Sequence, residues 1–275
     1  MNALFSALLG LIQGITEFLP VSSSAHLAIF QNIWNINPGL LLDIGVHFGT
    51  ALAVIIVYRG YIWKIISEFF LSLIRIVREK SKVKYEFSNS KGFRFVILLI
   101  ITSIPAAIAG FFLEDKIVAM FESMKLIGIA LIITGILLWA SDKLKRGEKK
   151  DILQVSPKNA LVIGIAQAIA VFPGISRSGM TITASLASGL DRSLAANYSF
   201  IASLPIIIGA MLSQLIGGAL EAFTMGMGVL LIGIFVAFIS GLVAIKFVKK
   251  LVVSNKYRYF SFYLWIVGIL LIIFG

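Results

Sequence analysis

Long stretches without charge constrain the fold of this chain more than any other feature of its sequence. A hydrocarbon core about 30 Å thick needs about 20 helical residues to cross it, with a range of roughly 17–25. Five uncharged apolar stretches approach or exceed this length, and a sixth contains Asp43 and His47. The six stretches are Leu41–Tyr58, Phe95–Leu113, Leu126–Ser141, Ser193–Leu220, Ala222–Ile245 and Tyr259–Gly275. We therefore predict an all-α integral membrane protein with six transmembrane helices.

The composition agrees with this prediction and excludes several kinds of chemistry. Of the 275 residues, 59% are hydrophobic and 13% are charged, against about 45–50% and about 25% in soluble domains. The chain has no cysteine, which excludes disulfides, thiolate metal sites and a cysteine nucleophile. With only two histidines, a metal site would depend on carboxylates, and its metal would be Mg²⁺ or Ca²⁺.

The basic residues predict the topology. Although the net charge is +11, 18 of the 24 Lys and Arg residues fall in three runs, Arg75–Arg94, Lys143–Lys158 and Lys246–Arg258. Basic loops collect on the cytoplasmic side of a membrane, where they contact anionic lipid head groups. Their aromatic content is too low to suggest stacking on bases. We predict a multi-pass protein of the cell (plasma) membrane that binds no nucleic acid.

The same orientation assigns the shorter segments. Two acidic loops are expected outside; their acidic residues are Glu114, Asp115, Glu122 and Glu221. Tyr61–Val77 is expected to be a helix extension that lies at the inner interface. Asp191 and Arg192 are expected to start a solvated helix at the same interface.

The first residues do not resemble a cleavable signal peptide. Met1–Ile12 carries no basic residue, whereas a signal peptide begins with a basic region. Gln13 and Glu17 then interrupt the apolar run. We keep this segment as mature structure, and because no linker or low-complexity tract divides the chain, we expect one domain over 1–275.

Two apolar segments remain, residues 3–30 and 159–190, and neither can cross the membrane without placing a basic run on the wrong side. Each has a proline and a serine-rich turn halfway, Leu19–Ser24 and Phe172–Ser178. Proline breaks a helix, and a broken helix is tolerated in a membrane where protein or a wet cavity satisfies its backbone groups. We predict that each segment forms a re-entrant helical hairpin.

The two hairpins resemble each other in sequence. The matched pairs, 154 residues apart, are Gly10 with Gly164, Gln13 with Gln167, and Asp43 with Asn197. Because the loop charges place the ends of the hairpins on opposite sides, we predict an inverted-topology repeat whose broken helices meet near the bilayer midplane and form the site there. Repeat 1 would cover about 1–120 with a basic insertion at 60–94, and repeat 2 about 155–275. Asp43 and Asn197 are expected to cap helices.

Glu17 is the acidic residue of the first hairpin and lies four residues after Gln13, so both side chains face one side of a helix. A carboxylate buried in hydrocarbon costs at least about 2.5–3.5 kcal/mol on insertion scales. We expect a divalent cation or Arg177 to compensate it. A protonated carboxyl, hydrogen-bonded to Thr16 or to serines, is the alternative without function.

Arg177 is the only basic residue of the second hairpin and stands at its tip between Ser176 and Ser178. A guanidinium at a helix N-terminus combines bidentate donors, backbone N–H groups and the positive end of the helix dipole. This combination predicts a site for a phosphate or a carboxylate, to which Thr181 could add a hydroxyl. The alternative is a structural bridge to Glu17.

Histidines and serines are the candidates for proton transfer and nucleophilic attack. His26 follows three serines in the first hairpin, and imidazole suits proton transfer near neutral pH. A packing role is the alternative for His26, and we favour that role for His47, which lies in a span with no turn nearby. Ser23 and Ser176 could be nucleophiles, donors to an oxyanion or caps of turns.

Two motifs closely resemble those of the undecaprenyl pyrophosphate phosphatase family, the bacitracin-resistance type of integral membrane phosphatase. The first runs from Gln13 to His26 and includes Glu17-Phe-Leu-Pro-Val-Ser-Ser-Ser24. The second is Pro173-Gly-Ile-Ser-Arg-Ser-Gly-Met-Thr181. Both stand in the family's order, and the hydropathy matches along nearly the whole chain.

This resemblance implies hydrolysis of a polyprenyl diphosphate to the monophosphate and inorganic phosphate, a step that recycles the lipid carrier of cell-wall and glycan synthesis. It also implies a homodimer and a site open to the outer face. Glu17 would bind Mg²⁺ or Ca²⁺ and Arg177 the diphosphate, with Ser176 assisting. The further substrate contacts would be Gln13, Ser22, Ser24, Gly174, Ser178 and Thr181.

The resemblance leaves the attacking group open between Ser23 and water. We hypothesise that His26 is the general base for either one. Many members of the family carry Glu where this chain has Gln13, which leaves Glu17 as the only carboxylate of the motif.

Other classes of protein fit parts of the pattern. A transporter or flippase of an anionic lipid would also use broken helices at the midplane, and phosphate release from a prenyl diphosphate distinguishes a hydrolase from it. A phosphatidic-acid-phosphatase type of enzyme would need a second His followed by an Asp after the Ser-Arg pair, and this chain lacks them. A structural scaffold gives no reason to bury Glu17, His26 and Arg177 together.

Overall fold

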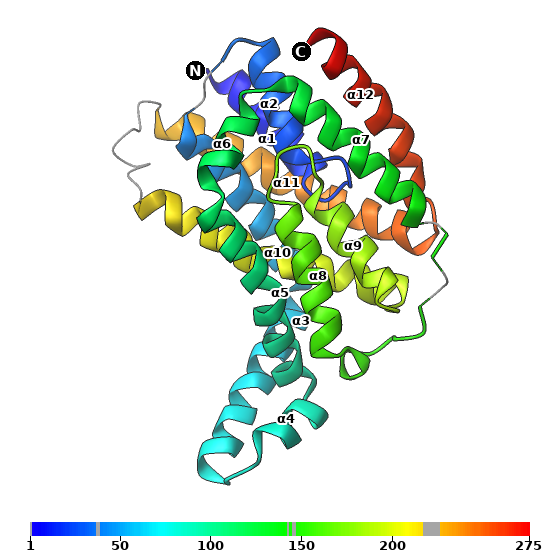
Figure 1. The fold of residues 1–275 in the computed structure, drawn as a ribbon. Coiled ribbons are helices and arrows are strands. Elements are labelled where there is room, and N and C mark those ends of the chain that lie inside the picture. Colours follow the sequence, from blue (N-terminus) through cyan, green and yellow to red (C-terminus); the bar gives the residue numbers. More distant parts are fainter. Residues whose placement is uncertain (1, 37–38, 142, 145–146, 217–225) are drawn as a thin grey trace.

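A computed structural model describes residues 2–36, 39–141, 143–144, 147–216 and 226–275. These residues form helices and connecting turns, and no strand occurs among them apart from one isolated bridge between Lys149 and Leu190 (Figure 1). The helices are α1 Ala3–Thr16, α2 Ser23–Ile33, α3 Leu40–Arg78, α4 Val83–Asn89, α5 Lys91–Phe112, α6 Glu114–Phe121, α7 Met124–Ser141, α8 Pro157–Ile169, α9 Arg177–Ala187, α10 Arg192–Ile216, α11 Met227–Val253 and α12 Phe260–Phe274. Short 3₁₀ segments at Ile152–Gln154 and Tyr257–Tyr259 precede α8 and α12.

Six helical segments of the described chain are long and apolar enough to cross a membrane. They are α3, α5, α7, α10, α11 and Tyr257–Phe274, which contains α12. The all-α class and the six predicted spans are therefore confirmed. Parts of these predictions lie outside the described residues: 217–220 at the end of one span, Glu221 of the outer loop, 222–225 at the start of the next span, and Lys145 and Arg146 of the second basic run.

α1 and α2 form one helical hairpin, and α8 and α9 form another (Figure 1). α1 ends at Thr16, and Pro20 lies in the buried turn at 17–22. α8 ends at Ile169, and Pro173 lies in the buried turn at 170–176. The prolines therefore stand where the sequence predicted the helix breaks. Re-entry of the hairpins into a bilayer stays a prediction.

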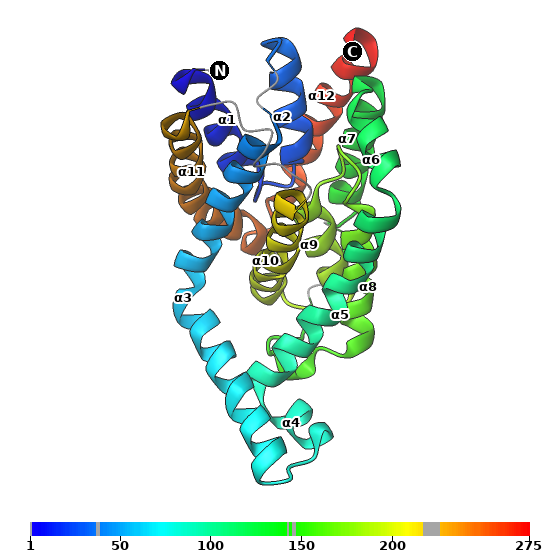
Figure 2. The same cartoon turned by 90° about the vertical axis from the view of Figure 1, so that its left-hand side faces the viewer.

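Serine side chains begin the second helix of each hairpin. The Ala25 N–H donates to Ser22 Oγ (3.4 Å) at the start of α2, and the Gly179 N–H donates to Ser176 Oγ (3.1 Å) at the start of α9. Such caps satisfy backbone donors that a helix leaves unpaired at its N-terminus. α2 extends toward the end of the molecule that holds both chain termini, whereas α8 begins on the side of α4 (Figure 2).

Each hairpin packs on a helix from the other half of the chain. α1 lies along α11 and α8 along α5, while α3 contacts α10 and α7 contacts α12. Two matched glycines permit the hairpin crossings: a Cβ on Gly10 would collide with the Gly233 carbonyl of α11, and a Cβ on Gly164 would lie 2.7 Å from the Thr102 carbonyl oxygen of α5. Small residues permit such close contacts between membrane helices. The inverted repeat itself stays a prediction.

α3 differs from its prediction at the C-terminal half. It is one helix of 39 residues, about 58 Å long at 1.5 Å per residue. The predicted extension at Tyr61–Val77 is present, but it projects from the body together with α4 and does not lie across its end (Figure 2). Contacts with the next elements hold it there, because the Gly92 N–H of α5 donates to Glu68 Oε2 (2.7 Å).

The structure describes two of the polar segments that the sequence predicted at the ends of the spans. Asp191 caps α10 by accepting the Leu194 N–H at Oδ1 (2.7 Å), as expected of a helix start. The first outer loop contains a short helix, α6, whose first turn carries Glu114 and Asp115. Carboxylates there complement the positive end of the helix dipole.

The expectation that Asp43 and Asn197 cap helices is wrong. Both lie inside the helical range, since α3 begins at Leu40 and α10 at Arg192. Asp43 Oδ1 instead accepts a hydrogen bond from Gln31 Nε2 (3.0 Å), and Asn197 Oδ1 accepts one from the Tyr58 hydroxyl (3.0 Å). Each therefore links two elements of the fold.

Residues of the first two basic runs contact one another at the start of α5. Lys91 forms an ion pair with Asp151, and the Arg94 guanidinium donates to the Val155 carbonyl at 2.8 and 3.0 Å. In the third run, the Arg258 guanidinium lies 5.7 Å from the centre of the Trp139 ring near the end of α7. These contacts agree with the placement of the three runs on one side of the membrane.

An ion pair between Arg75, whose side chain is 39% exposed, and the buried Glu86 joins the end of α3 to α4 and predicts a pH dependence of this region. The Arg75 guanidinium donates two hydrogen bonds to the Glu86 carboxylate (2.7 and 3.0 Å). These bonds lower the pKa of Glu86 from 4.5 to about 2. Because the pKa is lowered by folding, the stabilisation is complete above about pH 4.5 and is lost as the pH falls toward about 2.

Hydrogen exchange at the α4 amides measures this loss. Corrected for intrinsic rates, protection in α4 is expected to fall by up to about tenfold per pH unit between pH 4.5 and 2. Glu86→Gln should show low protection at pH 7 that changes little on acidification, whereas Glu79→Gln, an exposed neighbour, should behave like the unmodified protein. Constant protection of the unmodified protein down to pH 2 would contradict the prediction.

Candidate active site

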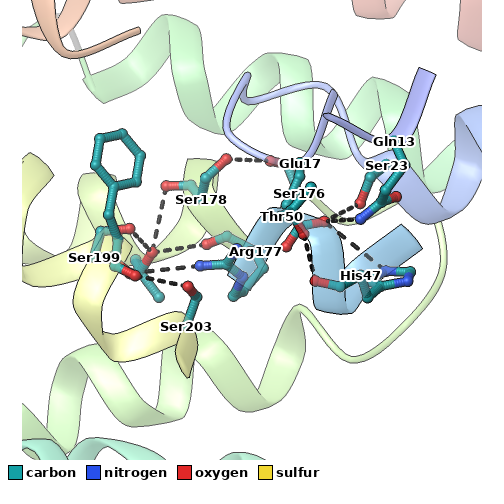
Figure 3. Close-up of polar contacts among 12 residues, drawn as sticks. Gln13, Glu17, Ser23, His47, Thr50, Ser176, Arg177, Ser178, Ser199 and Ser203 are labelled. Atoms are coloured by element: carbon teal, nitrogen blue, oxygen red, sulfur yellow. Dashed lines mark hydrogen bonds and ion pairs between the residues drawn. The ribbon is translucent and has the colours of Figure 1, made fainter. Parts of the chain in front are cut away.

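Glu17 lies at the centre of a polar cluster between the two hairpin turns (Figure 3). It directly follows α1, and its side chain is 6% exposed. Arg177 Nη2 donates to Glu17 Oε1 at 2.7 Å. The Ser23 hydroxyl and Gln13 Nε2 donate to Oε2 at 2.6 and 2.8 Å. His47 Nε2 lies 3.9 Å from the same oxygen.

The two hairpins supply this cluster from the starts of their second helices. Ser23 is the first residue of α2 and Arg177 the first residue of α9, so two helix N-termini converge beside one carboxylate. The turns also contact directly, because the Ser178 hydroxyl donates to the Leu19 carbonyl (3.1 Å). Converging helix N-termini and a guanidinium favour an anion such as phosphate.

The backbone before Ser23 is strained. Ser22 has φ 67° and ψ 97°, a conformation that residues other than glycine rarely adopt. Such outliers cluster at functional sites, where the surrounding structure holds them. The Ser22 hydroxyl caps α2 and lies 3.1 Å from that of Ser24. Ser23, which is half-buried, directly follows this residue, and its hydroxyl donates to Glu17 Oε2.

The polar residues of the second motif mostly support the Arg177 backbone. The Thr181 hydroxyl donates to the Arg177 carbonyl (2.8 Å) and lies 2.5 Å from the Ser199 hydroxyl. Gly174 has φ 92° and accepts a hydrogen bond from the Thr134 hydroxyl (3.0 Å). Ser176 caps α9, with its hydroxyl 3.2 Å from that of Ser178. Their predicted contacts with substrate stay predictions.

His26 is buried away from the contacts of Glu17. Its Nδ1 lies 2.8 Å from the Ser22 carbonyl oxygen, which can only accept, so Nδ1 carries the proton. Its Nε2 then accepts a hydrogen bond from the Tyr263 hydroxyl of α12 at 2.6 Å. The two rings are stacked with centroids 5.6 Å apart. Both ring nitrogens are thus engaged by groups other than Ser23.

His47 lies nearer to Glu17 than the sequence predicted, and its role stays a prediction. The structure places it beside Glu17, with its Nδ1 2.7 Å from the Asp43 carbonyl oxygen. Asp43 and His47, four residues apart in an apolar span, were the sequence feature that indicated such a place. Ionisable residues inside a span are functional candidates by default. No sequence signal pointed to Tyr263, whose contact with His26 joins residues 237 positions apart.

The donor set around Glu17 fits a divalent cation only in part. No group of three or more His, Cys, Asp or Glu side chains arranged for a metal occurs in the described ranges. However, Gln13 Oε1 is buried and has no hydrogen-bond partner there. Mg²⁺ is often held by one or two carboxylates together with phosphate oxygens of the substrate. Glu17 and Gln13 Oε1 fit such a shared site and not a cage built from protein alone.

The fold and the cluster together define a polytopic membrane protein with a buried polar cluster that contains Glu17, Ser23 and Arg177. Comparison with known proteins gives the family. The chain matches the model of the family described as Bacitracin resistance protein BacA over residues 6–270, and it belongs to this family.

Curated relatives match along almost the entire chain. This chain is 37% identical to the undecaprenyl-diphosphatase of Alkaliphilus metalliredigens over 280 aligned residues, which cover 100% of this chain and 99% of the relative. It is 40% identical to the undecaprenyl-diphosphatase of Halothermothrix orenii, with 96% and 95% covered. It is 41% identical to that of Desulforapulum autotrophicum, with 97% and 96% covered.

Proposed function

We propose that this protein is a membrane phosphatase that hydrolyses undecaprenyl diphosphate to the monophosphate and inorganic phosphate. The observation that carries the proposal is the contact of Glu17 with both Ser23 and Arg177, which joins a nucleophile, a base and an anion-binding group in one buried place. The names of the relatives agree with it. The reaction recycles the lipid carrier of cell-wall synthesis.

The first chemical step is attack by Ser23. Its hydroxyl donates to Glu17 Oε2 at 2.6 Å, within the reach required of a general base. The oxygen of Ser23 forms a bond to the terminal phosphorus, and the bond from that phosphorus to the bridging oxygen breaks. Glu17 takes the hydroxyl proton and passes it to the bridging oxygen of the leaving monophosphate.

The second step releases phosphate and restores the serine. Water attacks the phosphoserine, Glu17 takes a proton from that water, and the proton returns to the oxygen of Ser23 as its bond to phosphorus breaks. In both steps Arg177 and the N-termini of α2 and α9 stabilise the charge on the equatorial oxygens. Direct attack by water on the diphosphate is the alternative.

The exposure of the cluster indicates where the diphosphate enters. The Glu17 and Arg177 side chains are 6% and 14% exposed, whereas that of His47 is 33% exposed. We therefore propose that the diphosphate enters on the His47 side of the cluster, which is the N-terminal part of α3, away from the end where α4 lies (Figure 2). By the placement of the basic runs this is the outer side.

We propose that Glu17 and Gln13 hold a divalent cation together with the substrate. The cation would neutralise charge on the diphosphate. Gln13→Glu adds a second carboxylate, and it is expected to lower the Mg²⁺ concentration for half-maximal activity by about tenfold, because charge count raises the affinity of such sites. Phosphate release from chelator-treated protein, titrated with Mg²⁺ or Ca²⁺, measures the change. Gln13→Asn adds no charge and should not lower this concentration; equal curves for all three proteins would contradict the prediction.

We propose that His26 positions Ser23. The hydrogen bond from Nδ1–H to the Ser22 carbonyl fixes the backbone on which Ser23 stands. His26→Ala is expected to lower kcat by about 10²-fold, the loss that a misplacement of about 1 Å can cause, and to leave the pH profile of the residual activity unchanged. Tyr263→Phe keeps the ring that stacks on His26, so its kcat should fall less than that of His26→Ala. If His26→Ala lost the acidic limb of the pH profile of activity, His26 would instead be the general base.

An assay of the purified protein in detergent tests the function. Release of inorganic phosphate from prenyl diphosphates of several chain lengths is expected, and Arg177→Ala and Glu17→Ala should abolish it. Translocation of an anionic lipid without phosphate release would support the transporter. A homodimer is a further prediction, which the mass of the protein in detergent measures.

A further inference from the structure

A cavity with two lysines in its lining lies between α3, α10 and α11, at the end where the basic runs gather. Its volume is about 440 Å³. Its lining residues are Val57, Tyr58, Tyr61, Asn197, Ile245, Lys246 and Lys249. It differs from the Glu17 cluster in chemistry, since its lining contains two ammonium groups, two phenols and an amide, and no carboxylate.

The cations of this cavity have no counter-ion in the described part of the chain. None of the ion pairs there involves Lys246, Lys249 or the adjacent Lys250. The spacing of three and four residues places all three ammonium groups on one side of α11. Lys249 Nζ lies 5.8 Å from the centre of the Tyr58 ring, a neutral cation–π partner that leaves the ammonium without an opposite charge. Three like charges on one helical turn favour an added anion.

Neutral groups of the cavity add hydrogen-bond donors. The Tyr58 hydroxyl donates to Asn197 Oδ1 (3.0 Å), so the amide oxygen is occupied and the Asn197 amide N–H groups remain to donate. A mixture of ammonium and amide donors suits the oxygens of a phosphate.

An apolar groove continues from the cavity along α11. It has a volume of about 390 Å³ and is lined by Leu242, Val243 and Phe247, with Lys246 and Lys250 at its edge. Val243 and Phe247 are more than half exposed. Because Lys246 lines both spaces, a single ligand with an anionic head and an apolar chain fits them together.

The position along α11 matches the level of lipid phosphates. Residues 222–245 are uncharged, and Lys246 is the first charged residue after them. Basic pockets between transmembrane helices on the cytoplasmic side bind anionic lipid head groups. We propose that this cavity binds the phosphate head group of an anionic phospholipid of the inner leaflet, with an acyl chain along the groove.

This site is separate from the Glu17 cluster. Phe200 lies between them: its ring is 6.5 Å from that of Tyr58 on the cavity side and 5.7 Å from that of Phe18, the neighbour of Glu17. Both phenylalanines are fully buried. The proposal therefore does not depend on the proposed hydrolase activity.

Lipid binding to the full-length protein in detergent tests the proposal. Native mass spectrometry is expected to show retention of one phosphatidylglycerol per chain and no retention of phosphatidylcholine. The double variant Lys246→Gln/Lys249→Gln should bind phosphatidylglycerol roughly thirtyfold more weakly, since each lysine near a lipid surface contributes about fivefold. Lys246→Arg/Lys249→Arg should retain binding, and so should the control Lys82→Gln/Lys84→Gln, which removes two exposed charges at the start of α4.

Several results would overturn the proposal. These are equal losses in the test and control variants, equal retention of phosphatidylcholine, and displacement of the phospholipid by glycerol phosphate alone. Displacement by a prenyl monophosphate at lower concentrations than phosphatidylglycerol would assign the cavity to the reaction product instead. An unchanged melting temperature of the glutamine variant without lipid shows that any loss of binding is not loss of fold.

Discussion

Replacing Arg177 with alanine is expected to lower kcat by about 10³-fold or more while the protein still inserts into membranes. An arginine that stabilises a transferred phosphoryl group contributes about 10³–10⁵ in kcat, and Arg177 is the cation that contacts Glu17 at the junction of the hairpins. Arg177→Lys should recover part of the loss, since lysine retains the charge but not the planar fork of donors. Initial rates of phosphate release measure both variants, and Arg78→Ala, exposed at the end of α3, serves as the control.

Loss of fold is the competing explanation for an inactive Arg177→Ala protein. Removing one partner of a buried ion pair costs about 3–5 kcal/mol, because the other charge is left uncompensated. The double variant Glu17→Gln/Arg177→Ala removes both charges, so its melting temperature should recover while its activity does not. Recovery of activity in the double variant, or an active Arg177→Ala protein, would assign Arg177 to structure alone.

The fold could be predicted from the sequence because a membrane leaves few alternatives. Uncharged stretches of suitable length become spans, and the prolines at 20 and 173 stand in the turns where the hairpins reverse. The extension of α3 could not be predicted in direction. Its amphipathic pattern is compatible both with lying on a membrane and with packing on α4, and the Arg75–Glu86 contact that favours α4 joins residues 11 apart across a turn.

The sequence predicts which residues form the candidate site more readily than it predicts which of them contact each other. Glu17, Ser23 and Arg177 stand out as polar residues in apolar hairpins, and the structure brings these three together. The relative places of His26 and His47 could not be predicted, since they depend on how α2 and α3 are rotated about their own axes. His26 turns toward Tyr263 of α12, and His47 turns toward Glu17.

Ser23→Ala is expected to lower kcat as strongly as Arg177→Ala does, because it removes the nucleophile and not the charge that stabilises the phosphoryl group. The Ser23 hydroxyl donates a hydrogen bond to Glu17 Oε2 at 2.6 Å. No other hydroxyl among the described residues donates to this carboxylate. Removing a nucleophile from a unit of nucleophile and base typically costs more than about 10³-fold in kcat. Ser88→Ala, which removes an exposed hydroxyl of α4, should leave the rate unchanged.

The fate of the terminal phosphate separates attack by serine from attack by water. With a prenyl diphosphate labelled in its terminal phosphate, acid quenching of the unmodified protein is expected to trap label on a peptide that contains Ser23, and Ser23→Ala should trap none. Glu17→Gln should also trap little, because the base that accepts the serine proton is missing. If water attacks directly, Ser23 only donates a hydrogen bond, so Ser23→Ala would retain activity within about tenfold and no protein would carry label. A labelled peptide from the second hairpin would instead assign the attack to Ser176, which the cap of α9 otherwise occupies.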